Sequence, residues 1–330
     1  MFNLLFCFRC PCRKLEGYAT IESTARSAGA VKRVQIPPYA ERMSTTSLHV
    51  QHERQFEGNR FVYPVISRRS RGLSIGVNLN PDKLCNFHCI YCQVDRSVAG
   101  ETRFVELDRL VAELDELLAA AVSGTLFESG KFRSVPLDLR RLNDIAFSGD
   151  GEPTTHQNFD EIIAACAEVK RRHGLGDVKM VLITNASRFH RPHVQRGLEI
   201  LDCNQGEIWA KLDAGTEAYF RLVDRSPISL SRVLENITQA ARIRPLVIQS
   251  LWMQIHGEPP SREEIRAFCQ RLCDITACGG RLSLIQIYTI ARRPAESFVA
   301  PLSDEQVDEI AGIVRGETGL PVDSYYGVGA

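Results

Sequence analysis

The feature that most constrains the fold is a repeated alternation of short β-type runs with amphipathic helical segments, which begins near residue 72. The β-type runs lie at 73–78, 144–148, 178–184, 207–212, 247–255 and 282–290. Helical patterns lie near 104–122, 157–173, 191–201, 228–243, 261–273 and 303–315. Strands that alternate with helices predict a parallel sheet with right-handed crossovers.

Six such units are too few for a closed eight-stranded barrel, so a partial barrel and an open doubly wound sheet are the two candidate architectures. We predict the partial (β/α)6 TIM-like barrel of parallel strands, with helices outside. In either architecture, functional residues lie at the C-terminal ends of the strands. Chemically unusual residues should therefore follow the predicted strands directly.

The segments that flank the repeated units define the expected organisation of the chain. We assign 72–316 to the barrel, 43–71 to a segment that precedes it, and 317–330 to a C-terminal tail. Residues 1–42 mix Cys7, Cys10 and Cys12 with Ser, Thr, Ala and Arg and show no clear periodicity. This pattern predicts a disordered extension or a mis-assigned translation start.

Composition is that of an ordinary globular protein. Of the 330 residues, 44% are apolar and 24% are charged, and no apolar run approaches the roughly 20 residues of a membrane span. The 40 basic and 40 acidic residues cancel, although residues 1–72 carry twelve basic against five acidic. The odd count of eleven cysteines argues against a secreted disulfide framework. We therefore expect reduced cysteines, a cytoplasmic protein and no membrane partner.

A Cys-x3-Cys-x2-Cys loop follows the first predicted strand, with Cys85, Cys89 and Cys92 close enough to converge on one metal centre. A closed structural zinc site needs four ligands, and His88 would have to strain to serve as the fourth. A simple electron-carrying cluster normally has four cysteines. Three cysteines leave one iron of a cubane cluster open to a cofactor or substrate. The spacing thus favours an iron–sulfur cluster, with zinc and plain buried cysteines as alternatives.

This loop resembles the signature of the radical S-adenosylmethionine superfamily, which has an aromatic residue before the last cysteine, as Tyr91 is here. The resemblance implies a [4Fe–4S] cluster on Cys85, Cys89 and Cys92. It also implies S-adenosylmethionine, chelated to the open iron through its methionine amino and carboxylate groups. Reduction of the cluster, by a flavodoxin or ferredoxin, would then release a 5′-deoxyadenosyl radical that abstracts hydrogen from a substrate.

The second predicted strand ends in a Gly-rich turn, Ser148-Gly149-Asp150-Gly151-Glu152-Pro153. Its glycines allow close backbone approach and positive φ angles. The turn is similar to the Gly-Gly-Glu-type motif of the superfamily, with Asp150 between the glycines, and this implies binding of the methionine amino group. On the residues alone, a βα turn whose Glu152 and Asp150 cap the next helix is the competing interpretation.

Polar residues also follow the later strands. Asn185, in Thr184-Asn-Ala-Ser187, is expected at the ribose or the methionine carboxylate, with a helix-capping turn as an equal alternative. Lys211 and Asp213 point to the same side of the fourth strand. Asp213 would bind the ribose hydroxyls and Lys211 would act near the substrate, unless the two form a plain salt bridge. Candidate pocket residues further along are Gln249, Gln254, His256, Glu258, Gln286, Tyr288 and Arg292.

The likeness covers residues 72–292. Segments 149–153, 211–214 and 287–292 look most like a group of uncharacterised Fe–S oxidoreductases that is similar to the radical enzyme of tRNA wyosine synthesis. Three functions stay open: a radical enzyme acting on a small molecule or RNA base, an activase of a glycine on a partner protein, and a non-enzymatic Fe–S electron carrier.

A second cluster is a further open question. Its candidate ligands are the Cys7, Cys10 and Cys12 group and the later group of Cys269, Cys273 and Cys278. Cysteines on helices are more often small buried hydrophobic residues.

Overall fold

The computed structural model describes residues 56–96, 100, 104–294 and 296–327, all of which lie in the unit Tyr39–Ala330. The predictions made for residues 1–42, including Cys7, Cys10 and Cys12, fall outside these ranges. Among the described residues, no helix combines the length and the apolar character that a membrane crossing requires.

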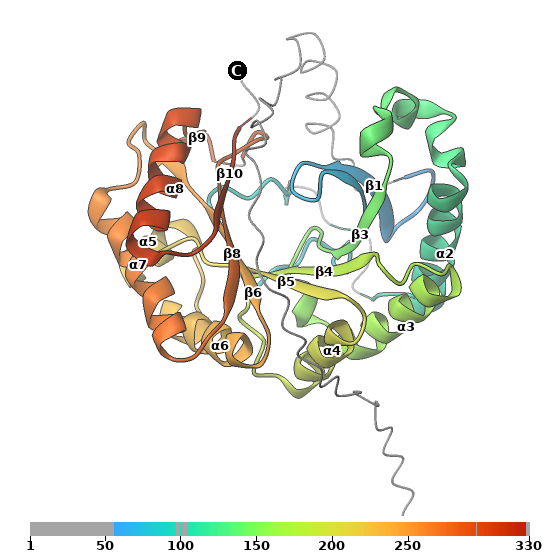
Figure 1. Ribbon diagram of the computed structural model, residues 1–330, viewed down its shortest axis with the longest axis horizontal. Coiled ribbons are helices and arrows are strands. Elements are labelled where there is room, and N and C mark those ends of the chain that lie inside the picture. Colours follow the sequence, from blue (N-terminus) through green and yellow to red (C-terminus); the bar gives the residue numbers. More distant parts are fainter. Residues whose placement is uncertain (1–55, 97–99, 101–103, 295, 328–330) are drawn as a thin grey trace, which may run out of the picture. The chain divides into compact units, whose positions relative to one another are not determined.

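An eight-stranded sheet forms the centre of the fold (Figure 1). Its spatial order is β1 (Val62–Ser67), β2 (Gly72–Val77), β3 (Leu142–Phe147), β4 (Lys179–Thr184), β5 (Gly206–Lys211), β6 (Leu246–Leu251), β8 (Leu282–Tyr288) and β10 (Val322–Tyr325). The β1–β2 pair is antiparallel and every other neighbour in this sheet is parallel. A small antiparallel pair, β7 (Met253–Ile255) with β9 (Val299–Pro301), stands beside it.

The sheet curls into a partial barrel, because residues from all eight strands line a single cavity. One residue from each strand illustrates this: Tyr63, Ser74, Asp144, Ile183, Trp209, Gln249, Tyr288 and Tyr325. A flat sheet could not turn all of its strands toward one space. The predicted partial barrel of parallel strands is therefore confirmed.

Helices cover the outer face of this sheet (Figure 1). They are α2 (Leu107–Ser123), α3 (Phe159–Arg172), α4 (Pro192–Asp202), α5 (Glu217–Val223), α6 (Leu230–Ile243), α7 (Arg262–Ala277) and α8 (Asp304–Thr318). The main hydrophobic core lies between the helices and the sheet. A smaller apolar cluster of Ala146, Val181, Trp209 and Val247 lies on the cavity side.

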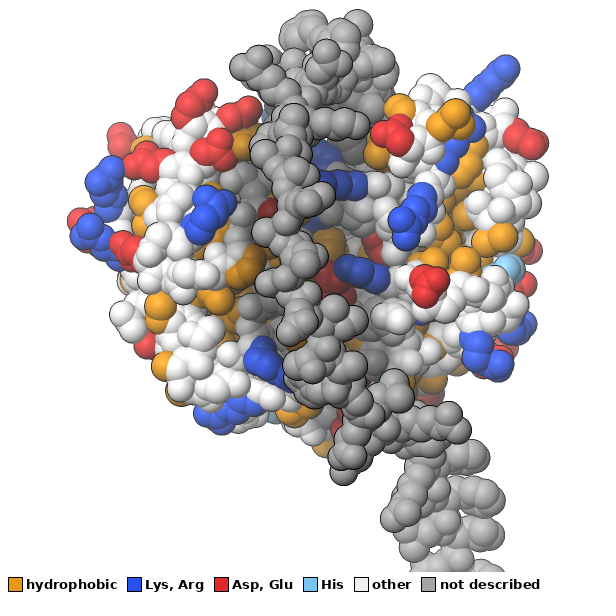
Figure 2. Space-filling view, viewed as in Figure 1, with side chains coloured by type: hydrophobic (Ala, Val, Ile, Leu, Met, Phe, Trp, Pro, Cys, Tyr) orange, Lys and Arg blue, Asp and Glu red, His pale blue; other side chains and the backbone are white. Residues whose placement is uncertain are grey.

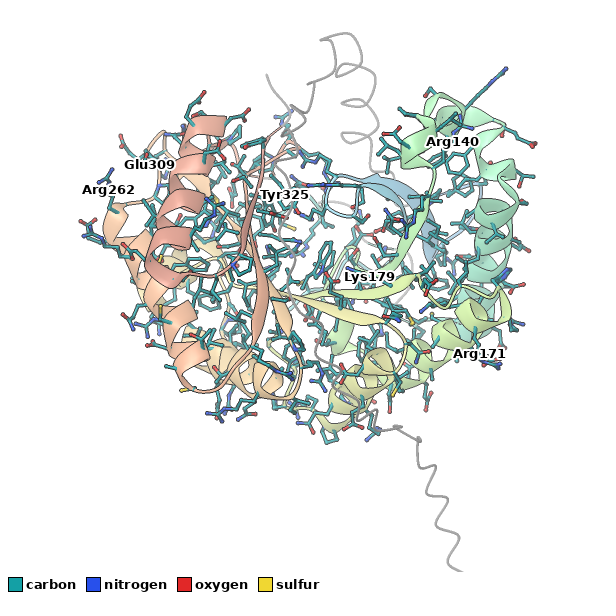
Figure 3. All side chains as sticks on the ribbon, viewed as in Figure 1. Arg140, Arg171, Lys179, Arg262, Glu309 and Tyr325 are labelled. Atoms are coloured by element: carbon teal, nitrogen blue, oxygen red, sulfur yellow. The ribbon has the colours of Figure 1, made fainter. Side chains whose placement is uncertain are left out.

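The helix starts follow the sequence signals. Ser303 and Gln306 form a reciprocal capping box at the start of α8, and Ser261 accepts a hydrogen bond from the Glu264 amide at the start of α7. An exposed ion pair between Arg262 and Glu309, at 2.8 Å, then links α7 to α8 (Figure 3). Around these helices, acidic and basic side chains are mixed on the face shown in Figure 2.

The structure differs from the predicted elements at both edges of the sheet. Strands β1 and β10 add to the six predicted strands, and the run 247–255 divides into β6 and β7 at the buried Trp252. Pro64 weakens the strand signal of β1, but an edge strand tolerates proline. The short α5 was also not anticipated, since seven residues give too little periodicity.

Candidate active site

A cavity of about 350 Å³ occupies the inside of the curled sheet. It is within the size range of small-molecule sites. Every residue expected to bind a cofactor or metal lines it, and so does Lys211, which is expected near the substrate: Cys85, Cys89, Tyr91, Cys92, Ser148, Gly149, Asp150, Gly151, Glu152, Asn185 and Asp213. These residues come from four segments that follow successive strands, so the fold brings them together where parallel strands end.

The three cysteines of the loop are free thiols on the wall of this cavity. Their sulfur atoms are not drawn together, because no group of three His, Cys, Asp or Glu side chains is arranged for a metal ion within the part of the chain that the structure describes. Cys89 Sγ instead donates to Asp224 Oδ1 at 3.2 Å. Burial and the carboxylate of Asp224 raise the pKa of the Cys89 thiol well above its usual value.

The donor set nevertheless fits an iron–sulfur cluster. Three thiols with no disulfide between them share one cavity wall, and a metal would displace their protons as it binds. The zinc alternative with His88 is less well supported, because His88 is exposed and is not among the residues that line the cavity.

Two neighbouring segments anchor the cysteine loop. The amides of His88 and Ile90 donate to the carbonyl oxygens of Asp224 and Val223 at the end of α5, at 3.1 and 2.9 Å. On the other side, Asn86 Nδ2 donates to Ser187 Oγ at 2.7 Å, and Asn86 Oδ1 accepts from Asn185 at 2.9 Å. The loop is thus held between the ends of β4 and α5.

The Gly-rich turn packs against the segment that leads into this loop. A Cβ atom at Gly149 would lie closer than 3.0 Å to the Asn78 side chain, and one at Gly151 closer than 3.0 Å to the Leu84 carbonyl. The expected close backbone approach is therefore confirmed, although its partner is the segment around the cysteine loop. Neither glycine adopts the positive φ that glycine also permits.

Glu152 makes the capping contacts that the sequence offered as the competing interpretation. Its carboxylate accepts from the Thr154 amide at 3.1 Å and from the Thr154 hydroxyl, at the start of a 3-10 turn (Pro153–Thr155). It also accepts from Thr184 Oγ1 at 2.6 Å and the Asn185 amide at 2.8 Å. Burial raises its pKa, and these hydrogen bonds oppose the rise. Glu152 thus ties the ends of β3 and β4 together at the cavity.

The segment after β4 also forms the expected capping geometry. Asn185 Oδ1 accepts from the Ser187 amide at 3.1 Å, which is an Asx turn. Thr184 Oγ1 accepts from the Ala186 amide at 3.0 Å, and Ala186 has a φ of 58°. Asn185 therefore shapes its own turn and contacts the cysteine loop through Asn86.

Lys211 and Asp213 form a salt bridge, with 3.0 Å between Nζ and Oδ2. This is the alternative that the sequence left open for the pair. Lys211 also donates to the Tyr288 hydroxyl at 2.7 Å. Asp213 accepts from the Tyr91 hydroxyl and, at 2.7 Å, from the Leu251 amide. Burial alone would lower the pKa of Lys211, but Asp213 and Tyr288 outweigh it and hold that pKa above its usual value.

A second carboxylate lies against this group. Burial, followed by the charge of Asp213, raises the pKa of Asp224 to about 8. Asp224 is 2% exposed and contacts Cys89, and sequence reasoning missed it because it ends a seven-residue helix. A buried acid that faces a thiol can be found only from the tertiary structure.

Other cavity residues were also missed. Arg68, Arg69 and Arg96 line the cavity, and so does Asp144, which accepts from the Ser74 hydroxyl. Among these missed residues, only Asp144 could have been suspected from the sequence, because it is an acidic residue within an apolar strand pattern. Of the later candidates, Gln249, Tyr288 and Arg292 line the cavity, whereas Gln254, His256, Glu258 and Gln286 do not. Cys269 is buried in α7, Cys273 is half-buried there, and Cys278 is exposed.

Comparison with known proteins identifies relatives of this chain. A "UPF0026 protein" of Helicobacter pylori is 28% identical over 248 residues, which are 74% of this chain and 70% of that protein. A protein named "GTPase Obg" from Brachyspira hyodysenteriae is 23% identical over 267 residues, 79% of this chain. The chain spans only 34% of the length of that second relative.

Among solved structures, TYW1 with a lysine–pyruvate adduct bound covers 85% of this chain and 90% of its own, with a TM-score of 0.45 and 14% identity. BtrN in complex with AdoMet and 2-DOIA covers 53% and 69%, with a TM-score of 0.27 and 17% identity. The model of the Radical SAM superfamily matches residues 79–269, more than half of the chain and including the cysteine loop. The chain therefore belongs to the radical SAM superfamily, whose members use a [4Fe–4S] cluster and S-adenosylmethionine.

Proposed function

We propose that this protein is an enzyme that binds both cofactors in the cavity of the curled sheet and modifies a substrate there by radical chemistry. The observation that carries this proposal is the position of the cysteine loop. Cys85, Cys89 and Cys92 line the same cavity as the polar residues at the ends of β3, β4 and β5. When bound, the cluster supplies an electron that cleaves S-adenosylmethionine to a 5′-deoxyadenosyl radical, which takes hydrogen from the substrate.

In this proposal the three cysteines hold the cluster and leave one metal position for the methionine group. The turn from Ser148 to Glu152 receives the methionine amino group beside the loop. Its two glycines favour this role, because they let the turn lie against the segment that carries the cysteines. Glu152 keeps the turn fixed to β4 through its bonds to Thr184 and Asn185.

Lys211 and Asp213 orient the rest of the reactants. Asp213 joins Tyr91 in the cysteine loop to β6, since it accepts from the Tyr91 hydroxyl and the Leu251 amide. We assign Asp213 to the ribose side of the cofactor and Lys211 to the substrate side. The apolar cluster on the cavity side, which includes Trp209 and Val247, excludes water from the reaction.

The electron donor and the substrate are separate parts of the proposal. A flavodoxin or ferredoxin is the expected reductant. The substrate is a small molecule or an RNA base. One alternative function is an activase that acts on a glycine of a partner protein. The other is an electron carrier, which has no substrate. The electron carrier is the weakest of these, because the loop supplies three cysteines where such a cluster normally uses four.

The proposal is tested by assaying 5′-deoxyadenosine after anaerobic loading with iron and sulfide, addition of S-adenosylmethionine and reduction with dithionite. We expect the wild-type protein to form it and the Cys89→Ala variant to form none. Cys203→Ala is the matched control, because Cys203 is an exposed thiol outside the cavity. Equal product from wild type and Cys89→Ala would refute the ligand assignment. A loaded wild type without product would leave two options, an electron carrier or an enzyme whose cleavage step waits for its substrate.

A further inference from the structure

The turn between β1 and β2 reaches the opposite edge of the sheet. In the strand order, β1 and β2 lie at one end and β8 and β10 at the other. Arg68 Nη1 in this turn donates to the Tyr326 carbonyl, just after β10, at 2.6 Å. The Arg69 guanidinium lies 4.4 Å from the centre of the Tyr288 ring and 6.0 Å from that of Tyr325. Figure 3 shows Tyr325 at the end of β10, where this contact is made.

Arg68 and Arg69 line the cavity, whereas Arg71 of the same turn does not. Neither Arg68 nor Arg69 forms an ion pair with a carboxylate among residues 56–96, 100, 104–294 and 296–327. The cavity carboxylates contact other groups: Asp213 contacts Lys211, Glu152 contacts Thr154 and Thr184, Asp144 contacts Ser74, Asp150 contacts Asn78, and Asp224 contacts Cys89. Two adjacent positive charges therefore face the cavity without a neutralising partner.

This arrangement is unfavourable for the protein on its own. Arg68 and Arg69 are half-buried, so water solvates their charges only in part, and two neighbouring guanidinium groups repel each other. Burial, followed by the charge of Arg69, lowers the pKa of Arg68, which agrees with this repulsion. An anion bound between them would relieve both effects, because the guanidinium group matches a carboxylate or phosphate with two parallel hydrogen bonds.

We infer that the substrate of this cavity is a small molecule with an anionic group, a carboxylate or a phosphate, that Arg68 and Arg69 bind. The inference rests on the proposed function, since it names the substrate class of the same site. A chain of contacts joins the anion position to the cysteine loop: Arg69 stacks on Tyr288, whose hydroxyl accepts from Lys211, and Lys211 Nζ lies 4.9 Å from the centre of the Tyr91 ring. The group to be modified then lies on the Lys211 side of the anion.

A single anionic group fits the site better than an RNA backbone. Proteins that bind a nucleic-acid backbone place several basic side chains along it. Here Arg68 and Arg69 lie inside the cavity beside two tyrosine rings, and Arg96 and Arg292 also line the cavity rather than an extended outer surface.

The test is a calorimetric titration of the full chain, without cluster or S-adenosylmethionine, with inorganic phosphate and separately with acetate, at constant ionic strength. We expect one of the two anions to bind the wild type, and Arg69→Gln to weaken that binding about tenfold, because a hydrogen-bonded charge partner is lost. The anion that binds identifies the group as phosphate or carboxylate. Arg71→Gln is the matched control, since Arg71 lies exposed in the same turn and outside the cavity lining.

Equal binding by the wild type and Arg69→Gln, or binding of neither anion, would overturn the inference, and so would binding of single-stranded RNA alone. If Arg69→Gln does not fold, judged by its thermal transition, Arg69→Lys serves instead. It keeps the charge but loses the paired hydrogen bonds, and we expect binding between that of wild type and none. Because no cluster is involved, failure of this titration and failure of the deoxyadenosine assay are independent results.

Discussion

At the scale of single residues, the surroundings of the cysteines separate two kinds of thiol. Cys85, Cys89 and Cys92 line the cavity, whereas Cys166 on α3 is fully enclosed in the main core. Burial raises the pKa of Cys166 to about 12. A cysteine of the second kind is a small hydrophobic residue with little reactivity.

This difference predicts the pattern of alkylation by iodoacetamide. Alkylation requires access to the thiol, so the exposed Cys203 should be modified throughout a series of reactions between pH 7 and 9. Cys166 should stay unmodified over that range, because its pKa of about 12 keeps it protonated and its side chain is inaccessible. Peptide mass spectrometry measures both sites, and unfolding in urea should make them equally reactive. Modification of Cys166 in the folded protein would contradict the packing of α3.

The carboxylates of the cavity differ in how far the sequence could predict their positions and contacts. Asp213 follows a predicted strand, so its place in the site could be expected from the sequence. Asp224 contacts Cys89 only because the loop rests on the end of α5. Glu152 was expected to bind a cofactor, and its four contacts with Thr154, Thr184 and Asn185 give it a structural role as well.

At the scale of elements, the Gly-rich turn is fixed by its packing against the segment around the cysteine loop. Asn78 Oδ1 accepts from the Asp150 amide at 3.0 Å, and Asn78 Nδ2 donates to Asp150 Oδ2 at 2.7 Å. Gly149 must lie next to Asn78 for these bonds to form. The turn and the loop therefore form one unit, although 72 residues separate Asn78 from Asp150.

We predict that Gly149→Ala destabilises the folded protein by about 1–3 kcal/mol, because the new methyl group overlaps Asn78 and the turn must shift. The control is Gly176→Ala, in an exposed turn where an added Cβ meets no atom within 4 Å. Urea denaturation followed by circular dichroism gives the free energy of unfolding of each variant. Equal stability of the two variants would show that the turn is looser than described.

A second element, the β1–β2 hairpin, is held at its start by a buried glutamate. Glu113 on α2 accepts from the amides of Arg60 and Phe61, at 2.9 and 2.7 Å, and from Arg109 at 2.8 Å. These bonds set where β1 begins. The hairpin turn that carries Arg68 and Arg69 is thus positioned from both ends, by α2 on one side and by the segment after β10 on the other.

At the scale of the whole molecule, sequence patterns predicted the parts of the fold that depend on local periodicity. The six strand-and-helix units were found because each carries its own apolar pattern and, at α7 and α8, a serine cap. The edges were missed, because β1 contains Pro64 and β10 has four residues, so their assignment depends on pairing with distant strands.

The candidate site also contains residues that the sequence could predict and residues that it could not. The cysteine loop and the Gly-rich turn could be located from spacing along the chain. The contributions of Arg68 and Arg69 could not, because they reach the far edge of the cavity only when the sheet curls and brings β1 toward β10. Asp224 could not either, because it meets Cys89 only where the cysteine loop rests on the end of α5. Residues in turns and loops belong to no helix or strand pattern, so the sequence does not show that they reach the site.

We propose that the cavity holds a cluster on three cysteines with one metal position open to S-adenosylmethionine. The most direct test is the electron paramagnetic resonance spectrum of the anaerobically loaded, reduced protein, recorded with and without S-adenosylmethionine. We predict that the cofactor changes the spectrum of the wild type and of Cys203→Ala, and that Cys89→Ala gives no four-iron signal. A spectrum that S-adenosylmethionine leaves unchanged, or a four-iron cluster retained in Cys89→Ala, would contradict the claim.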